Sequence, residues 1–183
     1  YPFVTSSNST SGGACTGLGI PPTKVDRALG VIKAYTTRVG EGPFPTELLD
    51  ADVERLGKVG HEFGATTGRA RRCGWFDAVV ARYGVHLNGV DALVLTKVDV
   101  LDGFNTIKVC TGYKYKEKIF PDMPADPEVI ANCGPVYVEF DGWSESTLGI
   151  QDYDKLPQNA KNYIDRLSEL VETPFMMIST GPD

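Results

Sequence analysis

The stretch Ala92-Leu93-Val94-Leu95-Thr96 is the segment that decides the fold class of this chain. It is a short, continuous apolar run, and such runs are typical of buried strands in parallel sheets. The polar residues Lys97 and Asp99 follow almost at once. Open α/β sheets bind ligands at the carboxyl ends of their strands, so this pattern predicts a ligand-binding edge directly after the strand.

Apolar strands and amphipathic helices alternate along the rest of the chain. Strands are predicted at residues 107–115, 136–140 and 175–179, and helices at about residues 22–35, 51–63, 75–83 and 157–171. A glycine-rich loop is expected at residues 5–19, and a proline-containing surface segment at residues 116–134. The alternation favours an α/β class with a largely parallel sheet flanked by helices. No internal repeat or domain boundary is visible, so residues 1–183 are predicted to form a single partial domain.

Composition narrows the function classes. The 183 residues include 18 Lys+Arg and 24 Asp+Glu, which gives a net charge of −6 and argues against duplex nucleic acid as a partner. No apolar run approaches the roughly 18–20 residues of a membrane span. The four cysteines are scattered without a C-x-x-C motif, which favours reduced thiols in a cytoplasmic protein. The chain begins at Tyr1 without a signal sequence and resembles a piece cut from a longer polypeptide.

An arginine-rich segment is the first candidate site. It reads Gly64-Ala65-Thr66-Thr67-Gly68-Arg69-Ala70-Arg71-Arg72. Arg69 and Arg71 are two positions apart, so in an extended loop they project the same way and can close on one anion through paired N–H donors. Thr66, Thr67 and Gly68 add hydroxyl and backbone donors. The alternative is an exposed, solvated basic loop.

The second candidate site is the polar end of the apolar strand. The carboxylate of Asp99 can accept hydrogen bonds from the N1–H and the exocyclic amine of guanine, a donor pair that adenine lacks. The stem of Lys97 could lie along the base while its ammonium stays in water. Ser179 ends another predicted strand that runs into a small-residue turn, and Ser179, Thr180 and Gly181 could contact the same purine. The alternative is a strand end with solvated charges.

Other catalytic arrangements are missing from the sequence. No G-x-x-x-x-G-K-[ST] phosphate loop is present, which also argues against a small GTPase. His61 and His86 lack a recognisable acid–base companion and are interpreted as structural residues. A complete GTP-using active site cannot be assembled from these 183 residues.

Several blocks together resemble one enzyme family, adenylosuccinate synthetase, from the first residue to the last. The resemblance predicts that the chain is the C-terminal portion of such an enzyme. The blocks that carry it are Tyr1-Pro2-Phe3-Val4-Thr5-Ser6-Ser7-Asn8, Lys33-Ala34-Tyr35-Thr36-Thr37-Arg38-Val39-Gly40-Glu41-Gly42-Pro43-Phe44-Pro45-Thr46-Glu47, Glu62-Phe63-Gly64-Ala65-Thr66-Thr67-Gly68-Arg69, Thr96-Lys97-Val98-Asp99-Val100-Leu101-Asp102, Gly142-Trp143-Ser144-Glu145-Ser146-Thr147 and Ile178-Ser179-Thr180-Gly181-Pro182-Asp183.

The resemblance implies a ligase of purine (AMP) biosynthesis that joins IMP and L-aspartate. GTP would place its γ-phosphoryl group on O6 of IMP, the aspartate amine would then displace phosphate, and Mg²⁺ would be required. It also implies a homodimer without nucleic-acid or membrane partners. The implied IMP-binding residues are Thr5 and Arg69; the aspartate-binding residues are Val39, Ala65, Thr66, Thr67, Gly68, Arg69, Ala70 and Arg71; the GTP-binding residues are Arg71, Lys97, Asp99, Ser179, Thr180 and Gly181.

The resemblance also implies what this chain lacks. The phosphate loop, the Mg²⁺-ligating general base and the general acid would all lie in a missing N-terminal part, so the fold would be incomplete and the chain inactive alone. Ala70 departs from the family pattern, because many relatives carry arginine or proline there. The alternative function is a stand-alone guanine-nucleotide-binding module without catalysis.

Overall fold

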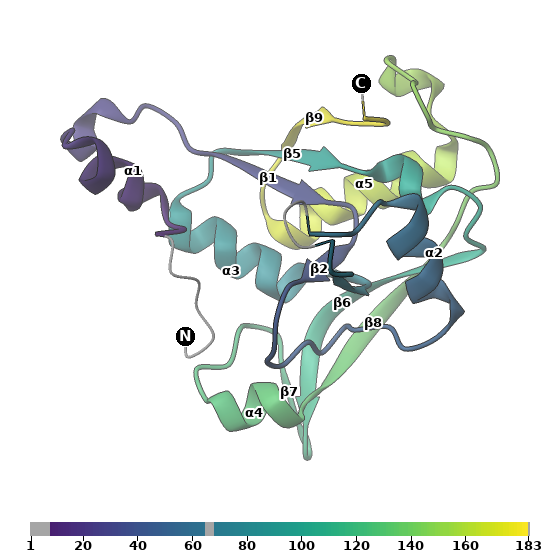
Figure 1. Ribbon diagram of the computed structural model, residues 1–183, viewed down its shortest axis with the longest axis horizontal. Helices are drawn as coiled ribbons and strands as arrows, with labels where there is room; N and C mark the ends of the chain where they lie inside the picture. The colour runs from purple at the N-terminus through teal and green to yellow at the C-terminus, as the bar shows by residue number, and fades with distance from the viewer. Residues whose placement is uncertain (1–7, 65–67, 183) are drawn as a thin grey trace.

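A three-stranded parallel sheet forms the centre of the fold. The structure is a computed structural model that describes residues 8–64 and 68–182. The sheet has the order β1-β5-β9, from β1 (Leu29–Lys33), β5 (Ala92–Thr96) and β9 (Phe175–Ile178). Both neighbours of β5 run parallel to it (Figure 1). The apolar run is therefore the central strand of a parallel sheet, as its composition predicts.

The remaining strands make the prediction of a largely parallel sheet only partly correct. A four-stranded sheet surrounds β6 (Thr106–Tyr115), which pairs antiparallel with β7 (Lys118–Phe120) and β8 (Gly134–Asp141) and parallel with β4 (Phe76–Asp77). The short strands β2 (Thr36–Arg38) and β3 (Arg72–Gly74) form a separate antiparallel pair. The connection between β6 and β7 is too short for a parallel crossover, so these strands form a hairpin.

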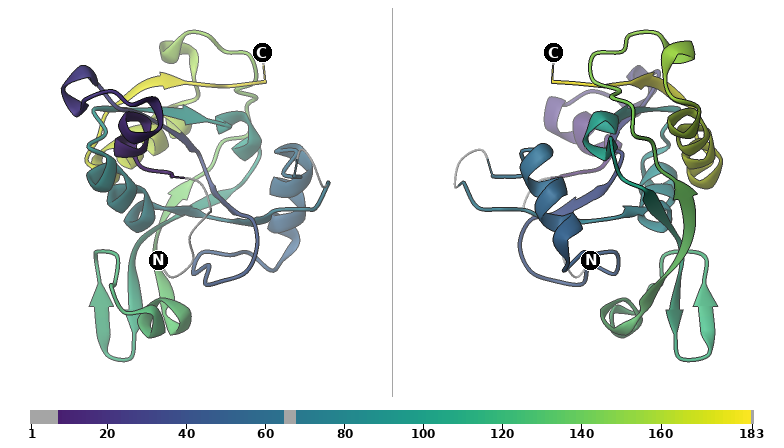
Figure 2. Two further views of the ribbon diagram at one scale, coloured as in Figure 1. Left: turned by 60° about the vertical axis from the view of Figure 1, so that its left-hand side comes forward. Right: turned by 90° about the vertical axis from the view of Figure 1, so that its right-hand side faces the viewer.

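Two helices pack against each other beside the parallel sheet, α3 (Ala78–Asn88) and α5 (Gln158–Val171) (Figures 1 and 2). The amphipathic helix predicted at residues 157–171 is confirmed as α5, whose residues Ala160, Tyr163, Ile164 and Leu167 are buried. They share one core with Leu93 and Leu95 of β5. The other helical segments are α1 (Ser11–Leu18), η1 (Pro22–Lys24), α2 (Ala51–Val59), η2 (Val98–Leu101), α4 (Pro127–Asn132) and η3 (Tyr153–Lys155).

The helix predicted at residues 22–35 is wrong. Only η1 is helical there, and residues 29–33 form the strand β1. Apolar residues at helical spacing suggested the helix, but the whole of β1 pairs with β5, and tertiary pairing overrides a weak local preference. Gly30 allows the close approach, since a Cβ at this position would lie 2.6 Å from Cδ2 of Leu93.

Other features also differ from the sequence prediction. Residues 11–18 are helical rather than a loop, and the start of α1 is tied to α3 by Asn88, whose Oδ1 accepts from the Ser11 amide at 2.8 Å. The helix expected at 75–83 begins at Ala78, because the Asp77 carboxylate caps it by accepting from two backbone amides. Strand β9 is less buried than predicted, with both of its methionines exposed at the open edge of the sheet.

The cysteines behave as the sequence predicts. All four are free; Cys15, Cys73 and Cys110 are buried and Cys133 is half-buried. Across residues 8–64 and 68–182, no helix combines the length and the apolar character needed to cross a membrane.

Candidate functional site

The carboxyl ends of β5 and β9 form the first part of the candidate site. The amide of Ser179 donates to the carbonyl of Leu95 at 2.7 Å, and the amide of Val98 donates to the carbonyl of Ser179 at 3.4 Å. The segments that leave the two strands therefore lie side by side (Figure 1). This arrangement brings Lys97, Asp99 and the turn at residues 179–181 together, at the edge where the sequence places them.

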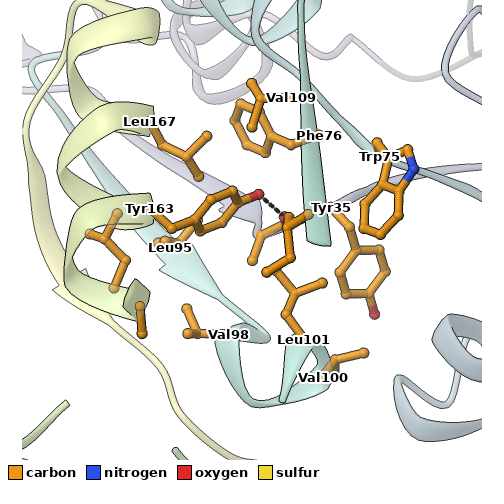
Figure 3. Packing of buried hydrophobic residues seen from close by; sticks show 14 of the residues in the cluster. Tyr35, Trp75, Phe76, Leu95, Val98, Val100, Leu101, Val109, Tyr163 and Leu167 are labelled. Carbon is orange, nitrogen blue, oxygen red and sulfur yellow. Dashed lines mark hydrogen bonds between the residues drawn. The ribbon is translucent and has the colours of Figure 1, made fainter. Parts of the chain in front are cut away.

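The helical turn η2 presents Asp99 at this edge. Its neighbours Val98, Val100 and Leu101 are buried in the core (Figure 3), whereas Asp99 is half-buried. Burial is the largest effect on the Asp99 carboxyl and raises its pKa; the nearby Asp102 acts in the same direction. A partly dehydrated carboxylate at a sheet edge is a strong acceptor for a ligand with two N–H donors.

A second carboxylate holds this turn in place. Asp102 Oδ1 accepts from Trp143 Nε1 at 2.7 Å and from Thr147 Oγ1 at 2.8 Å. Its Oδ2 accepts from the Thr147 amide at 2.7 Å and from Ser146 Oγ at 3.2 Å. The segment at residues 142–147 is thus fastened to the turn that carries Asp99.

The turn at residues 179–181 is also fixed by hydrogen bonds. Ser179 Oγ donates to the carbonyl of Gly181 at 2.9 Å, and Thr180 Oγ1 donates to the carbonyl of Ile150 at 2.8 Å. Both hydroxyls therefore have partners inside the protein. Their oxygens still have lone pairs with which they can accept hydrogen bonds from a ligand.

The arginine-rich segment forms the second part of the site. Its residues 69–71 run antiparallel to residues 62–64, because the Arg71 amide donates to the carbonyl of Glu62 and the Gly64 amide to the carbonyl of Arg69, at 2.9 and 2.8 Å. Arg71 Nη1 donates to Glu62 Oε2 at 2.8 Å, whereas Arg72 pairs with Glu47. These carboxylates reduce the repulsion expected within the arginine run. Gly68, Arg69 and Ala70 are exposed.

Val39 is brought to the same place by the β2–β3 ladder. Arg38 is paired with Arg72 at the end of the ladder, and the next residues along the two strands are Val39 and Arg71. Val39 is 71% exposed. The predicted ligand residues Thr5, Ala65, Thr66 and Thr67 lie outside the described residues.

A tight turn at residues 60–62 connects the two parts. Lys97 Nζ donates to the carbonyl of Gly60 at 2.6 Å, and two residues later Glu62 binds Arg71. The turn at the end of α2 thus binds one of the three N–H groups of the Lys97 ammonium, and the prediction that the ammonium stays in water remains a prediction. The two predicted sub-sites therefore lie on one edge of the molecule.

Sequence reasoning gave no role to Glu62, Lys33, Tyr35 or Asp102. Glu62 is 1% exposed and accepts hydrogen bonds from Lys33, Tyr35 and Arg71. Each of the four stands within a block that resembles the family, so a signal was present. The blocks did not show which side chains meet, because the partners are far apart in the sequence.

In the part of the chain that the structure describes, neither histidine side chain is hydrogen-bonded or ion-paired to Lys97, Asp99 or Arg71. His61 is exposed within the turn and has a positive φ of 49°. His86 lies 3.5 Å from the Glu172 carboxylate. Neither residue has a role assigned to it in the site. Within residues 8–64 and 68–182, no group of three or more His, Cys, Asp or Glu side chains could hold a metal ion.

Comparisons with known proteins agree with the resemblance. A family model described as adenylosuccinate synthetase matches residues 1–183. The chain is 56% identical over 182 residues to adenylosuccinate synthetase of Geobacter sulfurreducens, covering 100% of this chain and 42% of the relative. It is also 56% identical over 183 residues to that of Thioalkalivibrio sulfidiphilus, covering 100% of this chain and 43% of the relative.

A solved structure shows the same fold. Fully ligated adenylosuccinate synthetase from Plasmodium falciparum superposes with a TM-score of 0.95 at 42% identity, covering 100% of this chain and 44% of that one. The chain thus spans about two fifths of the length of its relatives (42% of the first). The prediction of a C-terminal portion, with an N-terminal part of the fold absent, is not confirmed by these matches. A family match along all 183 residues, together with the shared fold, shows that the chain belongs to the adenylosuccinate synthetase family.

Proposed function

We propose that this chain is one part, a single partial domain, of a GTP-dependent ligase that joins IMP and L-aspartate to form adenylosuccinate. GTP would transfer its γ-phosphoryl group to O6 of IMP, and the aspartate amine would then displace phosphate, leaving GDP and phosphate as co-products. Family membership supports this reaction. The observation that supports the proposal is that one turn links the two sub-sites: Lys97, two residues before Asp99, binds Gly60, and Arg71 binds Glu62.

The Asp99 end of the edge is proposed to read guanine. Its carboxylate would accept from N1–H and from the exocyclic amine, and adenine has no equivalent donor pair. Lys97 lies beside it at the end of β5, and the turn formed by Ser179, Thr180 and Gly181 closes the other side. Burial of Asp99 supports selectivity, because an unpaired carboxylate in a dehydrated position disfavours the wrong base.

The arginine end of the edge is proposed to bind the substrate anions. Arg71 would serve the aspartate carboxylate and reach toward GTP, and Arg69 would serve aspartate and IMP. Val39, Gly68 and Ala70 would line the same pocket. Arginine suits this role because its planar N–H donors match a carboxylate or phosphate in pairs. Thr5 and residues 65–67 are proposed to complete these contacts.

Mg²⁺ and the proton-transfer groups are proposed to be held by the rest of the enzyme. The described residues do not form a cluster that fits a metal ion, so no step is assigned to Mg²⁺ on this chain. The phosphate loop, general base and general acid are likewise assigned to the remainder. The 183 residues alone are therefore expected to be inactive, because O6 of IMP cannot be activated without them.

The first test compares the 183-residue chain with the full-length protein. Each would be incubated with IMP, aspartate, GTP and Mg²⁺, and adenylosuccinate would be quantified by chromatography. The full-length protein is expected to form the product and the chain is not. Product from the chain would contradict the division of the active site, and no product from the full-length protein would overturn the proposed reaction.

The second test separates the guanine role from the anion role. In the full-length protein, Asp99→Asn should weaken the binding of GTP and reduce the enzyme's preference for GTP over ATP, because the amide can accept only one of the two guanine hydrogen bonds. Arg69→Leu should instead impair the binding of aspartate and IMP. If a charge-assisted pair is lost, at about 1.5–3 kcal/mol per hydrogen bond, transition-state stabilisation should fall by several kcal/mol. An effect of Arg69→Leu below about 1 kcal/mol would indicate a solvated loop.

A further inference from the structure

The buried carboxylate of Glu62, which has no role in the proposed function, accepts several hydrogen bonds beside the site. The side chain of Glu62 is 0% exposed, and both of its oxygens accept from Lys33 Nζ at 2.7 Å. Tyr35 OH donates to Oε1 at 2.6 Å, and Arg71 Nη1 donates to Oε2 at 2.8 Å. Burial alone would raise the pKa of Glu62, but the hydrogen bonds from these three partners hold it below its ordinary value.

The cluster around Glu62 carries a surplus of positive charge. One carboxylate faces two cations, and the third donor, Tyr35, stays neutral because burial raises its pKa. The side chains of Lys33 and Arg71 are 25% and 31% exposed, so part of each cation reaches solvent at the edge of the site. An anion that arrives there meets a net attraction, whereas a closed one-to-one ion pair would offer none.

The two cations have different freedom within this cluster. Lys33 Nζ donates to both Glu62 oxygens and, at 2.9 Å, to Thr37 Oγ1, which occupies its three N–H groups. The guanidinium of Arg71 has five N–H groups, and within the described residues its side chain donates one hydrogen bond, to Glu62. Arg71 therefore has donors left for a ligand, while its position is set by the carboxylate behind it.

We propose that Glu62 is a positioning residue that holds the Arg71 guanidinium in the orientation that binds the aspartate substrate. Glu62 would act through Arg71 without touching substrate, and Lys33 would compensate the second half of its charge. This inference rests on the proposed function, because it takes the anion-binding role of Arg71 from there. Preorganising a charged donor lowers the cost of ordering it when the ligand arrives.

The test is a double-mutant cycle in the full-length protein, with steady-state kinetics at varied aspartate. Glu62→Gln leaves the shape nearly unchanged but removes the charge and one acceptor. It should raise the KM for aspartate about tenfold, the lower end of what a lost charge-assisted hydrogen bond gives, with a smaller effect on kcat. In an Arg71→Leu background, the same change should alter KM less than about twofold, because coupled residues are not additive.

Glu47→Gln is the matched control. Glu47 pairs with Arg72, the next arginine in the same segment, and it is also partly buried. This variant should leave the KM for aspartate unchanged even if it lowers the melting temperature. An equal rise in KM from Glu47→Gln would overturn the proposal, because it would trace the effect to general loosening of the segment.

A milder variant keeps the test decisive if Glu62→Gln fails to fold. Tyr35→Phe removes one donor from Glu62 and keeps both cations, so it should raise the KM for aspartate about twofold to threefold, and only when Arg71 is present. Additive effects in the cycle, or a lower melting temperature with unchanged KM, would overturn the positioning role. If Arg71→Leu itself leaves KM unchanged, the proposed role of Arg71 fails and this inference fails with it. If Arg71→Leu raises KM and the Glu62 and Tyr35 variants do not, only the inference fails.

Discussion

Replacing Asp102 with asparagine should destabilise the fold by about 2–4 kcal/mol. The carboxylate accepts two hydrogen bonds at each oxygen, from Trp143 Nε1 and Thr147 Oγ1 on one side and from the Thr147 amide and Ser146 Oγ on the other. Asparagine has nearly the same shape but only one acceptor oxygen. Either orientation of its amide therefore turns an NH₂ group toward two former donors.

The size of this stability loss depends on which of the four hydrogen-bond donors can turn to another acceptor. The two hydroxyls can rotate toward other acceptors, but the indole N–H of Trp143 and the backbone N–H of Thr147 cannot, and both residues are buried. One of these fixed donors is left without an acceptor, which costs about 1–3 kcal/mol. The bonds that remain lose their charged partner, and charge-assisted hydrogen bonds are roughly twice as strong as neutral ones, so about 1 kcal/mol more is lost.

Urea denaturation of wild type and variant at one pH measures this difference. Asp141→Asn serves as the control, because Asp141 is exposed at the end of β8 and its replacement should change stability by less than about 0.5 kcal/mol. A loss below about 1 kcal/mol for Asp102→Asn would refute the reasoning, since it would mean that water satisfies the released donors.

Three other changes probe the turn and the core. Gly60→Ala should destabilise the protein by more than about 1 kcal/mol in a thermal melt, because the new Cβ would lie 2.2 Å from Tyr35 OH and 2.6 Å from a backbone carbonyl, too close for either to stay in place; an unchanged melting temperature would contradict this clash. Tyr163→Phe should cost about 1 kcal/mol in urea, because it removes the buried hydrogen bond of 2.8 Å to the carbonyl of Ala34 (Figure 3), and a neutral result would mean that this carbonyl finds another donor. Although burial raises the pKa of Glu62, the hydrogen bonds from its partners hold it below its ordinary value, so the stability that Glu62 contributes is present above the unfolded-state pKa and is lost as pH falls through the folded-state pKa; acid unfolding of Glu62→Gln should lack this component, and identical acid profiles would argue against it.

The central strand and the polar residues at its carboxyl end could be predicted because their signals are local. An apolar run of five residues ends at Thr96, and the polar pair Lys97 and Asp99 follows at once. The long helix α5 was equally clear, since its apolar residues repeat at helical spacing over 14 residues. In each case the whole pattern lies within one segment, so the element can be predicted without knowing its partners in the fold.

Other elements could not be predicted because their structure depends on distant partners. Residues 29–33 have a spacing compatible with a helix, and pairing with β5 makes them a strand. Residues 11–18 contain three glycines, yet they form α1, whose first residue is tied to Asn88 by two hydrogen bonds. Local preferences this weak are decided by tertiary contacts.

The sequence by itself determined the family and the central strand, and it suggested which side chains would bind anions and guanine, because these depend on residue type and on spacing within short blocks. Only the tertiary structure decided that Glu62 lies behind Arg71, that Asp102 fastens residues 142–147 to the Asp99 turn, and that Lys97 reaches Gly60. These contacts join residues 9 to 45 positions apart, from Glu62–Arg71 to Asp102–Thr147. The physical reason is that hydrogen bonds act over about 3 Å, so a buried charge acquires its partners only when the chain has folded around it.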